Sequence, residues 1–147
     1  MRVAICDDEN VQLSITKTSL EAAYKSLDLV VDTYSSGAKL LNAIDTRHYD
    51  LIILDIEMPG LNGIDTAKKL RKIEDKVAIV FLTSHVEYAL EGYEVNALRY
   101  LTKPVNTEKL SEIISYLLEQ RKKDKRILLR NSEDVEMVCV ADIYYME

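Results

Sequence analysis

Cysteine is scarce in this chain of 147 residues, and long apolar runs are absent. The two cysteines, Cys6 and Cys139, are too few for a disulfide framework, which predicts reduced thiols in a cytoplasmic protein. No apolar run approaches the roughly 18 residues that a membrane span needs. The first ten residues, MRVAICDDEN, lack the apolar segment of a secretory signal. We therefore expect a cytoplasmic protein that does not enter a membrane.

Positive charge is also in deficit, with 19 lysines and arginines against 25 aspartates and glutamates. Residues 1–120 hold 13 basic and 19 acidic side chains, whereas RKKDKR at 121–126 holds five basic and one acidic. An acidic surface repels the phosphate backbone of nucleic acids. Residues 1–120 are therefore not expected to bind DNA by themselves, and the basic run is expected to be a solvated helix end and linker.

Only four glycines occur in the chain. Two of them lie in GLNG at 60–63, which does not match a dinucleotide-binding or phosphate-loop fingerprint. This stretch instead predicts a turn ahead of a helix.

Short apolar segments alternate with segments of helical periodicity along most of the chain. The predicted strands are 2–6, 29–34, 50–54, 77–82 and 97–101. The predicted helices are 11–27, 37–44, the segment that contains Ile64, Ala67, Leu70 and Ile73, 86–94, and an amphipathic segment that starts at Asn106 or Thr107. Strands that are apolar throughout indicate a parallel sheet covered by helices on both faces. We predict an α/β fold, a flavodoxin-like doubly wound sheet of five strands in the common order 2-1-3-4-5.

The pattern changes beyond Arg126. ILLRN at 127–131, an acidic turn at 132–134 and the remaining residues to 147 are rich in strand-forming residues without helical periodicity. Two or three strands hardly fold alone, so this β-strand tail is expected to begin a second domain. The predicted organisation is a first domain over 1–122, a linker over 123–126 and a fragment of the second domain over 127–147.

Polar side chains follow the ends of the predicted strands. The first strand leads into Asp7 and Asp8, the third into Asp55, the fourth into Thr83 and the fifth into Lys103. If strands one and three are neighbours, the three carboxylates meet at one edge of the sheet, where they repel one another unless a divalent cation neutralises them. We predict a Mg²⁺ site, with Mn²⁺ as the alternative ion. Beside the metal and Lys103, Asp55 is suited to act as a nucleophile towards a phosphodonor, with Thr83 as a hydrogen-bond donor.

At these residues the chain resembles the receiver domains of two-component response regulators. The matching motifs are CDDE at 6–9, LDIEMPGLNG at 54–63, LTS at 82–84 and RYLTKP at 99–104, and they occur in that order within residues 1–122. The resemblance implies that a histidine kinase passes a phosphoryl group to Asp55 in a Mg²⁺-dependent reaction. It also implies a phosphoacceptor signalling domain that phosphorylates and dephosphorylates only itself, and not an enzyme with other substrates.

The resemblance assigns further roles. It implies that the backbone carbonyl of Glu57 completes the metal ligands, that a cis peptide bond joins Lys103 to Pro104, and that Thr83 and Tyr100 form a switch pair. Phosphorylation adds roughly −1.5 to −2 charges at one point. We expect this charge to move Thr83, to draw Tyr100 inward and to repack the face formed by residues 85–120, through which a homodimer is expected.

The tail is similar to the opening strands of a LytTR-type DNA-binding domain. The similarity rests on ILLRNSEDVEMVCVADIYYME at 127–147, and TSHVEYALEGYEVNALRYLTKP at 83–104 is the form that receivers of such regulators commonly take. This implies a transcription regulator that contacts DNA only through a part of the output domain beyond residue 147.

Two other functions fit the same residues. A stand-alone receiver would act by docking partner proteins, but the tail argues against it. A magnesium-dependent aspartyl-phosphate phosphatase of the dehalogenase-like class would carry a second acid two residues after its nucleophile. Glu57 stands in that place, yet Met58 and Pro59 follow it and a pair of acids comes from another strand, so this alternative is disfavoured.

Overall fold

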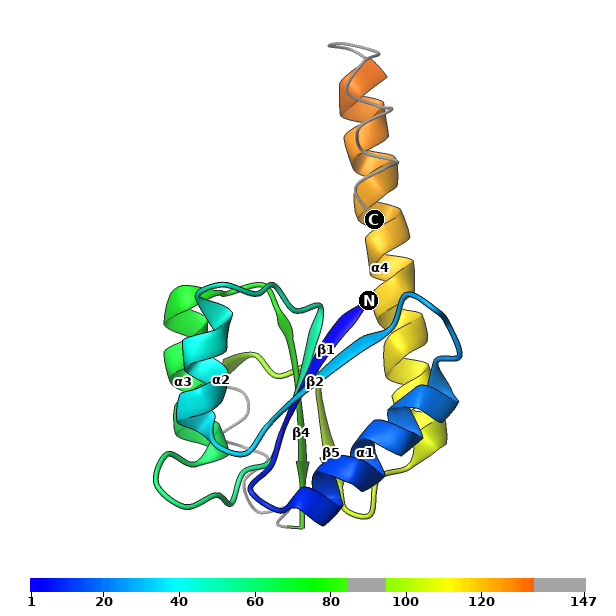
Figure 1. Cartoon of the computed structure of the whole chain (residues 1–147). Coiled ribbons are helices and arrows are strands. Elements are labelled where there is room, and N and C mark those ends of the chain that lie inside the picture. The colour runs from blue at the N-terminus through cyan, green and yellow to red at the C-terminus, as the bar shows by residue number, and fades with distance from the viewer. Residues whose placement is uncertain (85–94, 134–147) are drawn as a thin grey trace. The chain divides into compact units, whose positions relative to one another are not determined.

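The computed structural model describes residues 1–84 and 95–133 (Figure 1). These residues form two compact units, Met1–Leu110 and a second that starts at Ser111. The first unit holds one parallel sheet in the order β2-β1-β3-β4-β5. Its strands are β1 (Arg2–Cys6), β2 (Val30–Tyr34), β3 (Leu51–Leu54), β4 (Ala78–Thr83) and β5 (Arg99–Thr102). The predicted fold class and strand order are confirmed.

Helices cover both faces of this sheet. The helix α1 (Asn10–Ala23) lies on one face, and α2 (Gly37–Ile44) and α3 (Gly63–Ile73) lie side by side on the other (Figure 1). The helix α4 (Thr107–Glu133) begins in the first unit and makes up the described part of the second. Asn106 caps its start, because the side-chain oxygen accepts the amide of Glu108 at 2.8 Å. The helix predicted at 86–94 lies outside the described residues.

The three central strands, β1, β3 and β4, are almost entirely buried, as their continuous apolar runs predict, whereas the edge strands β2 and β5 are mostly half-buried or exposed. Every residue of β3 is buried, and the side chains that face α2 and α3 form one apolar cluster. Its members in the central strands are Ala4, Cys6, Ile52, Leu54, Ile79 and Phe81, and Leu40, Ile64 and Leu70 come from the two helices. Each large apolar side chain contributes about 1.5–3 kcal/mol when fully buried. The sheet therefore forms a firm support for the residues that follow its strands.

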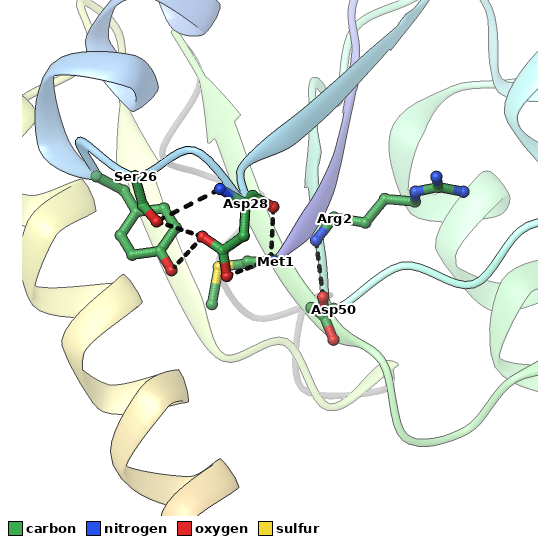
Figure 2. A network of polar contacts seen from close by, with 6 residues as sticks. Met1, Arg2, Ser26, Asp28 and Asp50 are labelled. Atoms are coloured by element: carbon green, nitrogen blue, oxygen red, sulfur yellow. Dashed lines mark hydrogen bonds and ion pairs between the residues drawn. The ribbon is translucent and has the colours of Figure 1, made fainter. Parts of the chain in front are cut away.

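The helix α1 ends at Ala23, whereas the predicted helix extends to Leu27. The side chain of Leu27 is fully exposed. Asp28 organises a turn here. Its carboxylate accepts a hydrogen bond from the Tyr24 hydroxyl at 2.9 Å. It also accepts one from the Ser26 hydroxyl, and the Asp28 carbonyl accepts one from the Met1 ammonium at 3.0 Å (Figure 2). The hydrogen bonds from Ser26 and Tyr24 lower the pKa of Asp28 to about 2. These polar contacts compete with further helical turns and direct the chain into β2.

The strand predicted at 127–131 is wrong, because α4 continues without a break to Glu133 and also includes the predicted linker at 123–126. Lysine, arginine and leucine favour helix, and no glycine or proline occurs after Pro104 to stop it. Extending an existing helix is also easier than starting a new element. Lys122 and Glu119 add an ion pair at 3.6 Å along it. The strands predicted over 134–147 lie outside the described residues, and the boundary at 122 stays a prediction.

Within residues 1–84 and 95–133, no helix combines the length and the apolar character needed to cross a membrane.

Candidate functional site

The pairing of β1 with β3 brings three carboxylates together. Cys6 is the register partner of Leu54, so Asp7 and Asp55 follow at the same edge of the sheet, and the Asp55 amide donates to the Cys6 carbonyl at 3.0 Å. Asp8 comes next along the chain. Carboxylate oxygens of Asp7, Asp8 and Asp55 all lie within 4.8 Å of one another. The predicted convergence of these three residues is therefore present.

Lys103 reaches the same place from β5. Thr102 pairs with Thr83 at the end of β4, and the Lys103 amide donates to the Thr83 carbonyl at 2.8 Å. The Lys103 ammonium lies 2.8 Å from Asp7 Oδ2 and 3.5 Å from Asp55 Oδ2. The peptide bond between Lys103 and Pro104 is cis. The ammonium thus bridges the carboxylates that follow β1 and β3.

The surroundings of Asp55 raise the pKa of its carboxyl group. Burial, and next the negative charge of Asp7, raise the pKa of Asp55 to about 6, although the nearby Lys103 ammonium opposes the shift. Burial would lower the pKa of Lys103, but its hydrogen bond to Asp7 and the two carboxylate charges raise it overall. Three carboxylates, two of them buried, against one ammonium leave an excess of negative charge at this edge of the sheet. That excess favours a further cation.

The donor set fits a hard divalent cation. Mg²⁺ and Mn²⁺ take oxygen ligands, and three carboxylates are gathered here with no sulfur or imidazole ligand in the group. Asp7 is held in place because its Oδ1 accepts the Glu9 amide at 3.0 Å while Oδ2 accepts Lys103. Glu57 lies two residues after Asp55 with an exposed side chain. The role predicted for its backbone carbonyl stays a prediction.

Gly63 supports the site in a way that the sequence analysis missed. A Cβ atom at Gly63 would lie only 2.0 Å from the Asp55 carbonyl oxygen, and the Gly63 amide donates to the Ile56 carbonyl at 2.8 Å. The first turn of α3 is thus packed directly on the backbone of Asp55. The available signal is a glycine at the first position of a helix, although GLNG by itself predicts only a turn ahead of that helix.

The predicted switch pair lies on neighbouring strands. Thr83 is fully buried at the end of β4. Tyr100 is the register partner of Phe81, and the two rings are 5.8 Å apart between centroids. Tyr100 is half-buried against the apolar cluster. The structure therefore provides the positions on which a switch would depend, and the roles of both residues stay predictions.

Comparison with known proteins identifies the family. The family model described as the response regulator receiver domain matches residues 3–115. The chain belongs to the response regulator receiver family.

Two curated relatives and one solved structure are similar to this receiver. Over 117 residues it is 38% identical to the positive alginate biosynthesis regulatory protein of Pseudomonas aeruginosa and 40% identical to the sensory transduction protein LytT of Bacillus subtilis. Each match covers 78% of this chain and 46% of the relative, so the chain spans about half the length of these relatives. The response regulator TrrA of Thermotoga maritima, solved in complex with Mg²⁺-BeF, is 31% identical with a TM-score of 0.66, over 79% of this chain and 97% of TrrA.

We predict that Asp55→Asn stabilises the metal-free chain at pH 8 but not at pH 4. The pKa of Asp55 is raised from 3.8 to about 6, so the folded state holds this proton more tightly than the unfolded state does. The stability gained from the proton is full below pH 4 and is lost as the pH rises through 6. Each unit of pKa shift corresponds to 1.36 kcal/mol, so the ionised carboxylate lowers the free energy of unfolding by up to about 3 kcal/mol. The neutral amide of asparagine avoids this loss.

Urea denaturation in EDTA at the two pH values measures this effect. The control is Asp45→Asn, which changes an exposed carboxylate outside the cluster and is expected to stay within about 0.5 kcal/mol of the parent chain. An equal effect of Asp55→Asn at pH 4 and pH 8 would contradict the account of the charge cluster.

Proposed function

We propose that this chain is the phosphoacceptor domain of a two-component response regulator, in which Asp55 takes a phosphoryl group from a histidine kinase. The observation that carries the proposal is the cluster at the carboxyl edge of the sheet. The oxygens of Asp7, Asp8 and Asp55 lie within 4.8 Å of one another, and the Lys103 ammonium is 3.5 Å from Asp55 Oδ2. Membership of the receiver family supports the same assignment.

Asp7, Asp8, Asp55 and the backbone carbonyl of Glu57 would hold Mg²⁺ or Mn²⁺. When bound, the divalent cation supplies positive charge that favours the ionised form of Asp55 and attracts phosphate oxygens. The oxygen-only donor set of the three carboxylates supports this part of the proposal, and so does the Mg²⁺-BeF complex of the relative TrrA.

In the transfer step, an oxygen of the Asp55 carboxylate forms a bond to phosphorus while the phosphorus–nitrogen bond of the donor phosphohistidine breaks. The imidazole nitrogen keeps the electron pair of that bond and takes up a proton from solvent. Lys103 faces the transferred group, because its ammonium already lies between Asp7 and Asp55. The Thr83 hydroxyl, at the end of the neighbouring strand, donates a hydrogen bond to one of the new phosphoryl oxygens.

The added charge provides the signal. A phosphoryl group on Asp55 brings roughly −1.5 to −2 charges into a buried cluster, which attracts Lys103 and Thr83. Movement of Thr83 leaves space that the half-buried ring of Tyr100 fills, and the face over residues 85–120 repacks into a homodimer interface. Residues 85–94 of this face lie outside the described residues.

The output of the switch is a LytTR-type DNA-binding domain that controls transcription in the cytoplasm. The curated relatives support this proposal, since they include a sensory transduction protein named LytT and are about twice as long as the matched segment. Of the tail at 127–147, the first residues continue α4 to Glu133 and residues 134–147 lie outside the described residues. The resemblance of the tail to the output domain rests on the sequence.

Intact-mass spectrometry after incubation with acetyl phosphate and Mg²⁺ tests the proposed acceptor. The chain is expected to gain one phosphoryl group, to lose it in hydroxylamine, which cleaves acyl phosphates, and to gain none in EDTA or as Asp55→Asn. Asp65→Asn, a carboxylate in the first turn of α3, is the control and is expected to be labelled like the parent chain. Labelling of Asp55→Asn at the parent level would refute Asp55 as the acceptor.

We predict that Tyr100→Ala separates phosphorylation from its output. The variant keeps the carboxylate cluster, so its labelling by acetyl phosphate should stay within about twofold of the parent chain. It lacks the ring that fills the space beside Phe81, so phosphorylation-dependent dimerisation, measured by sedimentation velocity, should be lost. Tyr24→Ala, which alters a tyrosine at the end of α1, is the control and should dimerise normally. Normal dimerisation of Tyr100→Ala would remove Tyr100 from the switch.

A further inference from the structure

Arg71, in the last turn of α3, donates three hydrogen bonds to backbone carbonyls outside its own helix. Its Nε donates to Val95 at 2.6 Å, its Nη1 to Val77 at 2.7 Å and its Nη2 to Asn96 at 3.2 Å. Val77 directly precedes β4, whereas Val95 and Asn96 lie just before β5. One side chain therefore ties the beginnings of two neighbouring strands to the end of α3.

The carbonyls that Arg71 binds lie in the turn before β5 and directly before β4. Asn96 has φ +54°, a left-handed conformation that is typical of turns. Val95 is buried, so an unpaired carbonyl there would be unfavourable. Hydrogen bonds from an ionised donor are roughly twice as strong as those between neutral groups. Burial lowers the pKa of Arg71, which means that its charge is partly withdrawn from water among these acceptors.

The strand that Arg71 secures is short and lies at an edge of the sheet. It has four residues and, among the described residues, it pairs with β4 alone. The Leu98 amide donates to the Ile79 carbonyl at 2.8 Å near the beginnings of the two strands, and the Lys103 amide donates to Thr83 at the other end. A slip of one residue in this pairing would turn Tyr100 to the opposite face of the sheet.

The helix α3 connects this anchor to the acceptor. Its first residue, Gly63, packs on the carbonyl of Asp55, and Arg71 lies in its last turn. Eleven helical residues span about 16 Å. The beginnings of β4 and β5 are thus bonded to the same helix that contacts the backbone of Asp55. Thr83 and Lys103 lie at the other ends of these two strands.

We propose that Arg71 is a positioning residue that holds β5 in register on β4, so that the charge gained at Asp55 moves Thr83 and Tyr100 instead of sliding β5 along its neighbour. This inference rests on the proposed function, because it concerns how phosphorylation is transmitted. An attraction between Lys103 and the phosphoryl group pulls on the far end of β5. With the near end fixed by three hydrogen bonds, the strand resists that pull, and the response is confined to the side chains beside the site.

The test compares Arg71→Gln and Arg71→Lys with Lys72→Gln, which changes an exposed cation at the next position of α3. NMR of the ¹⁵N-labelled chain reports two quantities: amide exchange without ligand, and the shift changes caused by Mg²⁺ with beryllium fluoride, an analogue of the phosphoryl group. In Arg71→Gln, Leu98 is expected to exchange at least tenfold faster, whereas the Asp55 amide, bonded to Cys6, keeps its protection. The shift change at Asp55 should persist while that at Tyr100 falls by more than half.

Arg71→Lys is expected to behave like Arg71→Gln, because a single ammonium cannot reach three carbonyls in the directions that the guanidinium does. If Arg71→Gln does not fold, Arg71→Lys alone tests whether Arg71 holds β5 in register. Parent-like Leu98 protection and a parent-like Tyr100 response in the Arg71 variants would overturn the inference and leave the proposed function intact. A parent chain without any response at Asp55 would overturn the proposed function and the inference with it.

Discussion

The repulsion between Asp7, Asp8 and Asp55 is the constraint on which this structure depends. The hydrogen-bonded register of β1 and β3 forces the three carboxylates together, and burial then raises the pKa of Asp55 to about 6. Lys103 offsets only part of this charge. The apolar sheet supplies the stability that keeps such an unfavourable group in place, and the remaining negative charge favours the binding of a cation.

The elements around the cluster hold it from several directions. The first turn of α3 packs on the backbone of Asp55 because Gly63 has no side chain, and the Glu9 amide orients Asp7. At the other end of α3, Arg71 binds carbonyls that precede β4 and β5. A change of charge at one edge of the sheet is therefore met by strands whose opposite ends are fixed. This arrangement suits a two-state response better than a gradual deformation.

Much of the fold and of the candidate site could be predicted because the relevant signals are local. Most strands are short apolar runs, and the first and third runs lead directly into carboxylates of the cluster, as Leu54 before Asp55 illustrates. The errors arose where side-chain contacts or helix extension, which leave no signal in the periodicity, decide the structure. Asp28 ends α1 through side-chain contacts, the residues at 127–131 extend α4 although their composition also suits a strand, and Arg71 binds carbonyls up to 25 residues away. Such contacts leave no periodic pattern in the sequence.

The most direct measurement is the pKa of the Asp55 carboxyl group, followed by ¹³C NMR with and without Mg²⁺. The account predicts a pKa of about 6 in the metal-free chain and a value lower by roughly 1 to 3 pH units when Mg²⁺ is present, because a neighbouring positive charge favours the carboxylate. A pKa that does not change with Mg²⁺ would contradict the claim that the repulsion between these carboxylates favours a bound divalent cation.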